Sequence, residues 1–182
     1  MKTHIFYLLL CSVAILWPQD SSAQQQLTPE QARDKMVAGR IYKPFPLTKS
    51  YHAVNGKAFD FSAHQKPVFL YVGEASCIIC SFELPVYLDL CRHFPDIDFV
   101  YLSPDDTAAI LKKFGKTLQL KNLVVLPIPG QLLWDKDVAR VYPVKYFIRK
   151  NGIVQDAATG GALKDREKVR GQWLVRLEAL QP

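Results

Sequence analysis

One short stretch constrains the fold of this chain more than any other. Residues 67–80 read PVFLYVGEASCIIC, so an apolar, β-branched and aromatic run is followed by a short loop and two cysteines. The apolar run at 67–73 predicts a buried central strand. The run 77–93 predicts a helix that begins at Cys77, with a kink at Pro85. The cysteine pair is therefore expected where a buried strand leads into a helix.

The spacing of the two cysteines suits thiol–disulfide exchange. The free N–H groups and the dipole at a helix N-terminus favour a thiolate at Cys77. Cys80 follows three residues later on the same helix face, so its sulfur can reach that of Cys77. One thiol can then attack a substrate disulfide while the other resolves the mixed disulfide.

Two other interpretations of the pair are half of a zinc site and a structural disulfide. Zinc needs two further ligands, and the nearby candidates are Cys91 and His93. On a continuous helix Cys91 lies about 16 Å along the axis from Cys80, which disfavours a shared metal ion. A structural disulfide would close a very short loop and stabilise the fold little. We expect Cys91 to be a buried, small apolar residue.

The rest of the chain alternates predicted helices and strands, which implies an α/β fold with a mixed central sheet flanked by helices. A capping box at Thr28 predicts a helix over 27–38, ended by Gly39. Asn55-Gly56 predicts a turn between two short strands. Further strands are expected at 97–103 and 123–127, helices over 103–116 and 131–141, a hairpin with its turn at 150–152, and a final helix over 163–180 with Val169, Trp173, Leu177 and Leu180 on one stripe.

The first residues have the pattern of a secretory signal peptide. Lys2 precedes an apolar run at 5–17, and small residues at Ser21 and Ala23 form a cleavage site. The apolar run is too short to span a bilayer comfortably. We therefore expect cleavage near Ala23 and export, in a bacterium to the periplasm. Three cysteines would remain, so at least one is unpaired within the chain.

Charge and composition exclude some functions. The net charge is +6, with basic and acidic residues mixed along the chain and no long basic run, which argues against nucleic-acid binding. The positive excess suits loose attraction to acidic partners or peripheral association with an anionic membrane surface. The three histidines after the signal peptide are scattered and indicate no metal site, and no cofactor is predicted.

The chain resembles exported thioredoxin-fold proteins, in particular the membrane-associated or periplasmic thiol-disulfide oxidoreductases that reduce partners during cytochrome c maturation. The resemblance rests on PVFLYVG, the CIIC pair, Glu83 and Pro85, the segment YPVKYFIRKNGIV and Gly160. It implies a thioredoxin-like fold. The domain organisation expected from it is a signal peptide at 1–23, an N-terminal helix and connector at 24–44, and a thioredoxin-like domain at 45–182 with an inserted helix and strand over about 103–127.

The resemblance also implies roles for single residues. Cys77 would be the exposed nucleophile and Cys80 the resolving thiol. Pro143 matches the family's cis-proline, beside which a substrate backbone docks by strand-like hydrogen bonds. Glu83 would assist proton transfer, unless it is a solvated helix carboxylate. The residues expected to line the substrate surface with Pro143 are Tyr142, Ser76, Ile78 and Ile79.

Several residues depart from the family's pattern. Ser76 stands where thioredoxins usually carry a tryptophan, and Ile78-Ile79 replaces the pair that often includes a proline. Glu74 would place negative charge near a Cys77 thiolate. Tyr71 falls where thioredoxin keeps a buried aspartate. These departures leave the direction of electron flow open, since pairs of this type range from about −120 to −270 mV.

The sequence therefore favours an exported oxidoreductase that reduces disulfides of specific partner proteins. A reductant in an oxidising compartment must be recharged, which implies a membrane electron-donor protein. The alternatives are a disulfide-donating oxidant and a thioredoxin-fold binding or scaffold module with little redox activity. A peroxide-reducing enzyme fits less well, because its usual threonine or serine several residues before the nucleophile and its distant resolving cysteine are missing.

Overall fold

The computed structural model describes residues 28–161 and 163–181, and the expected signal peptide lies outside this range. None of the helices in the described part is long and apolar enough to cross a membrane. The elements in chain order are α1 (Pro29–Ala38), β1 (Ser50–His52), β2 (Ala58–Asp60), β3 (Val68–Val72), α2 (Ile78–His93), β4 (Asp98–Ser103), α3 (Thr107–Phe114), the 3-10 helix η1 (Gly115–Gln119), β5 (Leu123–Pro127), α4 (Gly130–Asp135), β6 (Val144–Ile148), β7 (Val154–Thr159) and α5 (Arg166–Glu178).

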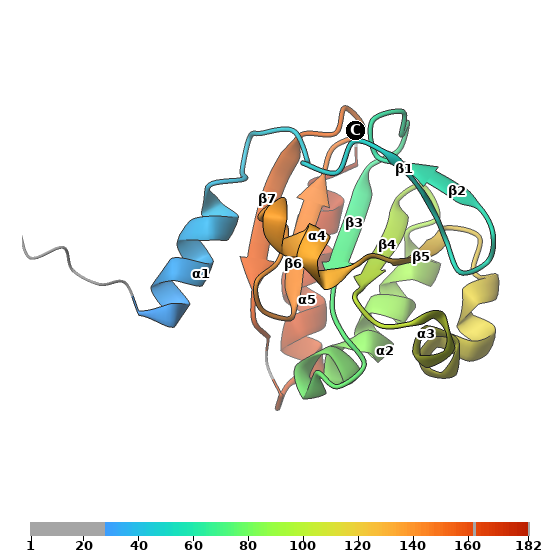
Figure 1. Ribbon diagram of the computed structural model, residues 1–182. Coiled ribbons are helices and arrows are strands. Elements are labelled where there is room, and N and C mark those ends of the chain that lie inside the picture. Colours follow the sequence, from blue (N-terminus) through green and yellow to red (C-terminus); the bar gives the residue numbers. More distant parts are fainter. Residues whose placement is uncertain (1–27, 162, 182) are drawn as a thin grey trace, which may run out of the picture.

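A five-stranded mixed sheet with the order β5-β4-β3-β6-β7 forms the centre of the molecule (Figure 1). β3 runs parallel to β4 and antiparallel to β6, so the strand that leads to the cysteines lies in the middle. Every residue of β3 is buried, because both faces of the sheet are covered. The mixed sheet and its buried central strand are confirmed.

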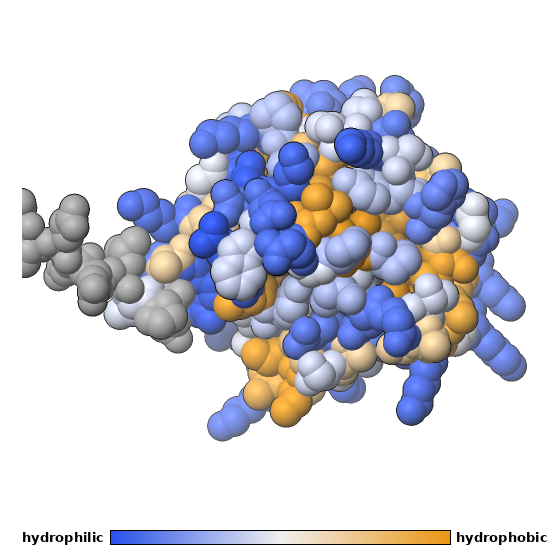
Figure 2. All heavy atoms as spheres, in the orientation of Figure 1, coloured by the Kyte–Doolittle hydropathy of each residue, from blue (hydrophilic) through white to orange (hydrophobic). Residues whose placement is uncertain are grey.

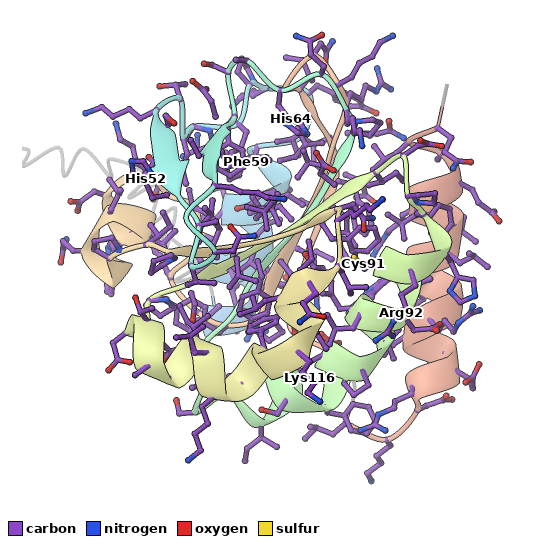
Figure 3. All side chains as sticks on the ribbon, turned by 90° about the vertical axis from the view of Figure 1, so that its right-hand side faces the viewer. His52, Phe59, His64, Cys91, Arg92 and Lys116 are labelled. Atoms are coloured by element: carbon purple, nitrogen blue, oxygen red, sulfur yellow. A yellow bond between two sulfur atoms is a disulfide. The ribbon has the colours of Figure 1, made fainter. Side chains whose placement is uncertain are left out.

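Two apolar cores cover the two faces of the sheet. α2 and α5 pack on one face and α4 lies on the other (Figures 1 and 3). Phe69 of β3 stacks on Phe147 of β6, with ring centroids 4.6 Å apart, and meets the edge of Trp173 at 5.3 Å. The predicted stripe is confirmed, since Val169, Trp173 and Leu177 of α5, and Leu180 just after its end, are all buried.

Three predicted helices are shorter than expected, and the last of them, expected over 163–180, spans Arg166–Glu178. The helix expected over 131–141 ends at Asp135, because the backbone turns at Asp137, where φ is +49°, and the N–H of Val138 donates back to Leu133. The helix expected over 103–116 begins after its N-cap, Asp106, since residue 103 still belongs to β4. The segment 136–142 is therefore irregular, and it leads directly to the predicted cis-proline.

The segment between α1 and β1 covers one edge of the sheet. Tyr42 N donates to Val154 O at 2.8 Å, Val154 N donates to Lys43 O at 2.9 Å, and Phe45 N donates to Gly152 O at 2.9 Å. α1 itself packs against β7. At the opposite edge, the loop after β1 contributes a bond from Val54 N to the β5 backbone, so flanking chain shields both edge strands from other strands.

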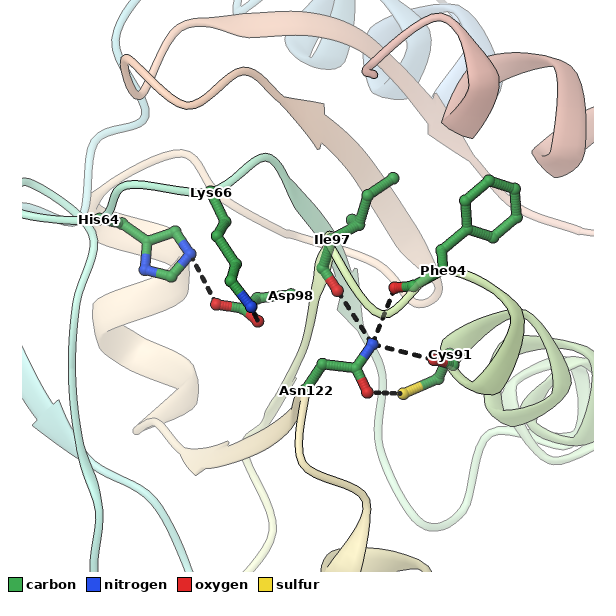
Figure 4. A network of polar contacts seen from close by, with 7 residues as sticks. All are labelled: His64, Lys66, Cys91, Phe94, Ile97, Asp98 and Asn122. Atoms are coloured by element: carbon green, nitrogen blue, oxygen red, sulfur yellow. Dashed lines mark hydrogen bonds and ion pairs between the residues drawn. The ribbon is translucent and has the colours of Figure 1, made fainter. Parts of the chain in front are cut away.

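Asn122 connects the end of α2 to the start of β5 (Figure 4). Its Nδ2 lies 2.9 Å from the carbonyl oxygens of Cys91 and Phe94 and 3.0 Å from that of Ile97. The Cys91 thiol donates to Asn122 Oδ1 at 3.3 Å. Cys91 is buried as predicted, and burial raises the pKa of its thiol to about 12.

We expect Asn122→Ala to lower the free energy of unfolding by about 2 kcal/mol, because carbonyl groups at the end of α2 lose their donor. Urea denaturation should show a lower midpoint with an unchanged slope. Lys121→Ala, at the exposed neighbouring position, serves as the control and should change stability by less than about 0.5 kcal/mol. Equal midpoints for the two variants would contradict this structural role.

Candidate active site

Cys77 and Cys80 are joined by a disulfide at the N-terminus of α2. Cys77 is the N-cap residue, and its Sγ accepts the Cys80 N–H at 3.0 Å. Cys77 is half-buried, whereas Cys80 is 0% exposed. The pair is therefore asymmetric: the first sulfur lies at the helix start, where free N–H groups favour a thiolate, and the second lies in the core.

Gly73 allows the end of β3 to approach the disulfide closely. A Cβ at this position would lie 3.0 Å from Cys80 Sγ and 2.5 Å from the Tyr101 hydroxyl oxygen. In the register between β3 and β6, Val72 faces Val144, which places Pro143 level with Gly73. The strand that begins after Pro143 therefore starts beside the cysteine pair.

The peptide bond between Tyr142 and Pro143 is cis, as the resemblance implies. Pro143 is buried, and Tyr142 is half-buried. Within residues 28–161 and 163–181, the N–H and C=O groups of Val141 and Tyr142 have no backbone hydrogen-bond partner. This backbone is available to pair with an extended peptide.

The loop before Cys77 carries polar and acidic groups. The Ser76 hydroxyl donates to Glu74 Oε1 at 2.9 Å, and Asp105 Oδ2 accepts the Ala75 N–H at 2.7 Å. Burial raises the pKa of Tyr142, and the Glu74 and Asp105 carboxylates raise it further. The carboxylates of Glu74 and Asp105 therefore lie close enough to Tyr142 to act on its hydroxyl, while an effect of Glu74 on Cys77 stays a prediction.

The residues between the cysteines form an apolar surface. Ile78 is 75% exposed, and Ile79 is half-buried. Ile79 lies against Gly161, where an added Cβ would come within 2.6 Å of its Cγ2. Ile78 and Ile79 thus present an apolar surface next to the half-buried Cys77.

Glu83 is 1% exposed, so it is not a solvated helix carboxylate. The Tyr71 hydroxyl donates to its Oε2 at 2.8 Å, and Lys145 Nζ lies 3.2 Å from the same oxygen. Burial raises the pKa of Tyr71, with a further contribution from Glu83. Tyr71 stands at the position where the resemblance implies a buried aspartate. Its hydroxyl instead binds the carboxylate of Glu83, which α2 supplies.

Lys145 is a site residue that sequence reasoning missed. It is buried in β6, donates to Gly160 O, and lies 5.6 Å above the ring centroids of Tyr71 and Trp173. Burial lowers the pKa of Lys145, and the Glu83 carboxylate acts in the opposite direction. A lysine in the apolar strand VKYFI was the available signal, because a buried lysine needs an anionic partner.

The described residues contain no group of three or more histidine, cysteine or acidic side chains that could hold a metal ion. The structure brings Cys77, Cys80, Pro143 and Glu83 to the same end of the sheet and leaves Ile78 on the surface. The individual role of each of these residues stays a prediction.

No protein-family profile matches the sequence, and no curated protein matches it significantly. Solved structures do resemble it. The structure of MTB dsbF in mixed oxidised and reduced forms is 23% identical with a TM-score of 0.61, covering 76% of this chain and 98% of that one. A secreted Mycobacterium tuberculosis disulfide oxidoreductase homologous to Escherichia coli DsbE is 22% identical with a TM-score of 0.60, covering 74% and 98%.

A third similar structure is the exposed lipoprotein thioredoxin Etrx1 of Streptococcus pneumoniae strain TIGR4. It is 25% identical with a TM-score of 0.53, and the match covers 71% of this chain and 98% of that one. The structural neighbours are thioredoxin-fold thiol-disulfide oxidoreductases of the DsbE and DsbF kind. The chain therefore has a thioredoxin-like fold, with a mixed sheet flanked by helices.

Proposed function

We propose that this protein is an exported thiol-disulfide oxidoreductase that reduces disulfides of specific partner proteins. The observation that carries the proposal is the Cys77–Cys80 disulfide at a helix N-terminus, beside a cis-proline strand with free backbone groups. Accessible sulfur and a peptide-docking edge are the two parts that disulfide exchange with a protein needs.

The reaction starts from the dithiol form. The Cys77 thiolate attacks one sulfur of the partner disulfide, that S–S bond breaks, and the released partner thiolate takes up a proton. The Cys80 thiol then loses its proton and attacks Cys77 Sγ, which frees the second partner sulfur as a thiolate that is also protonated. Two electrons and two protons pass to the partner, and the Cys77–Cys80 disulfide forms.

Substrate docking uses the surface around the cysteines. The partner backbone pairs with Tyr142 beside Pro143, and the side chains of Ser76, Ile78 and Ile79 contact the residues that flank the partner's cysteine. Support comes from the free backbone groups at Tyr142 and from the exposure of Ile78. An apolar contact surface would favour partner segments that are themselves partly apolar.

Glu83 accepts the proton that Cys80 releases. Cys80 has no exposed surface, and Glu83 follows three residues later on the same helix face, about 5–6 Å away between Cβ atoms. A cavity of about 310 Å³ lined by Glu83, Lys145 and Trp173 gives the proton a route to solvent. Lys145 and Tyr71 hold the carboxylate in place.

Export and recharging complete the proposal. Support for export comes from the signal-peptide pattern at 1–23 and from the secreted and surface-exposed proteins among the similar structures. A reductant outside the cytoplasm ends each cycle as a disulfide. A membrane electron-donor protein would return it to the dithiol form.

The redox potential of the Cys77–Cys80 pair tests the proposal. We expect a value near or below about −270 mV when the mature protein is equilibrated in thiol–disulfide buffers and its thiols are counted by alkylation. Cys91→Ala is the matched control and should give the same value, because Cys91 is buried.

Two other results of this titration would contradict the proposed direction or activity. A value near −120 mV would reverse the direction to disulfide donation. If no reversible two-electron transition appears, the oxidoreductase proposal fails and a thioredoxin-fold binding module becomes the better account.

A further inference from the structure

A second cavity, of about 610 Å³, lies between α1 with its connector and the irregular segment before the cis-proline. Figure 2 shows strongly hydrophilic residues gathered on this face, between α1 and the body of the protein. We call this cavity the basic pocket. Its charged lining, among the residues that the structure describes, consists of Arg33, Lys35, Arg40, Lys43 and Arg140, with Asp137 as the single acidic residue.

The described lining of the pocket has an excess of positive charge, because it holds one carboxylate, Asp137, which two arginines share. Arg140 Nη2 lies 2.7 Å from Asp137 Oδ1, and Arg40 Nη2 lies 3.8 Å from Asp137 Oδ2. Asp34 of α1 points elsewhere and accepts a hydrogen bond from Thr159 at 2.6 Å. A concave surface with an excess of positive charge attracts anionic groups.

The basic pocket continues into the peptide-docking edge of the active site. Arg140 and Val141 line the pocket and directly precede Tyr142 and Pro143. Val141 is 37% exposed, and its backbone groups are as free as those of Tyr142. A strand advances about 3.3 Å per residue, so a peptide paired beside Pro143 reaches the pocket within two to three residues.

We infer that the basic pocket binds an acidic segment of the partner polypeptide, located within a few residues of the cysteine that is reduced. This inference rests on the proposed function and adds a substrate class to it. The chain's own N-terminal residues are poor occupants, since 24–27 read QQQL and carry no charge. The cavity volume is within the range of sites that hold ligand groups.

The test uses two short peptide disulfides that differ only in glutamate or glutamine residues on both sides of the cysteine. We expect the dithiol protein to reduce the glutamate peptide at least about tenfold faster at low ionic strength, with the advantage falling as salt is added. The double variant Lys35→Glu/Lys43→Glu should lose this preference. Both lysines are exposed, and neither belongs to the cysteine site.

The matched control is Lys116→Glu/Lys121→Glu, which makes the same change of charge at exposed positions away from the pocket. Figure 3 shows Lys116 on the side that faces the viewer, with α1 behind the sheet. This control should keep the preference for glutamate. Equal rates for the two peptides with the wild-type protein would overturn the inference, while reduction of both would leave the proposed function intact.

A binding measurement separates the pocket from the redox chemistry. A fluorescent glutamate peptide with serine in place of cysteine should bind the wild-type protein, and bind the Lys35→Glu/Lys43→Glu variant at least about tenfold more weakly. If no disulfide is reduced but this peptide still binds in the pocket, the proposed function fails and the acidic-ligand site stands. Pocket-dependent binding to phosphatidylglycerol vesicles, without peptide binding, would overturn the inference in favour of a membrane surface.

Discussion

Cys77→Ser should reduce the rate of disulfide exchange by about a thousandfold or more, to the uncatalysed level. The thiolate is the nucleophile in this reaction, and a serine hydroxyl does not replace it. Cys80 cannot take over, because it is 0% exposed in the fold. The measurement is the second-order rate constant for reduction of a peptide disulfide by the pre-reduced protein.

Two cysteine variants serve as controls for this result. Cys91→Ser should keep the wild-type rate, since burial raises the pKa of the Cys91 thiol to about 12 and keeps it protonated. Cys80→Ser should still attack the substrate but accumulate the mixed disulfide, which mass spectrometry detects as a covalent adduct. A Cys77→Ser protein with an unchanged rate would rule out Cys77 as the nucleophile.

Lys145→Met should lower the free energy of unfolding by about 3–5 kcal/mol at neutral pH. The substitution removes the ammonium group 3.2 Å from Glu83 and leaves a buried carboxylate whose described hydrogen-bond partner is the Tyr71 hydroxyl. An uncompensated buried charge is far more costly than a well-packed neutral pair. Urea denaturation of the disulfide form measures the loss.

The double variant Glu83→Gln/Lys145→Met is the control for this prediction. The introduced glutamine is neutral, so much of the lost stability should return, and the double-mutant cycle should give a coupling of more than about 1 kcal/mol. In Lys145→Met the second exchange step should also slow, because uncompensated negative charge near Cys80 opposes formation of its thiolate. A loss below about 1 kcal/mol would show that the ion pair contributes little.

Local patterns were sufficient to predict most of the fold. The apolar run before the cysteines became β3 because five consecutive buried residues suit a central strand covered on both faces. The capping box at Thr28 and the apolar stripe of α5 could also be predicted, because each depends on residues that are close in the sequence. The cis peptide bond before Pro143 was predicted from the resemblance alone, because most peptide bonds that precede a proline are trans.

Features that depend on distant contacts could not be predicted. Glu83 and Lys145 are 62 residues apart, and no local pattern specifies that they meet in the core. The basic pocket requires α1 to lie beside the segment that precedes Pro143, which α1's own sequence does not indicate. The helix expected over 131–141 ended early because the carbonyl of Leu133, a buried residue, accepts the N–H of Val138, five residues later, in a turn wider than that of an α-helix.

The pairing of residues 42–45 with 152–154 affects the order in which the molecule can be assembled. The segment at 42–45 leaves the ribosome early, whereas its partner strand is made more than a hundred residues later. Bringing such distant segments together has a loop-closure cost, and contacts between segments far apart in the sequence slow folding. This edge, where 42–45 lies against the start of β7, therefore forms only after residue 154 has been synthesised, so the N-terminal connector reaches its final place late in folding.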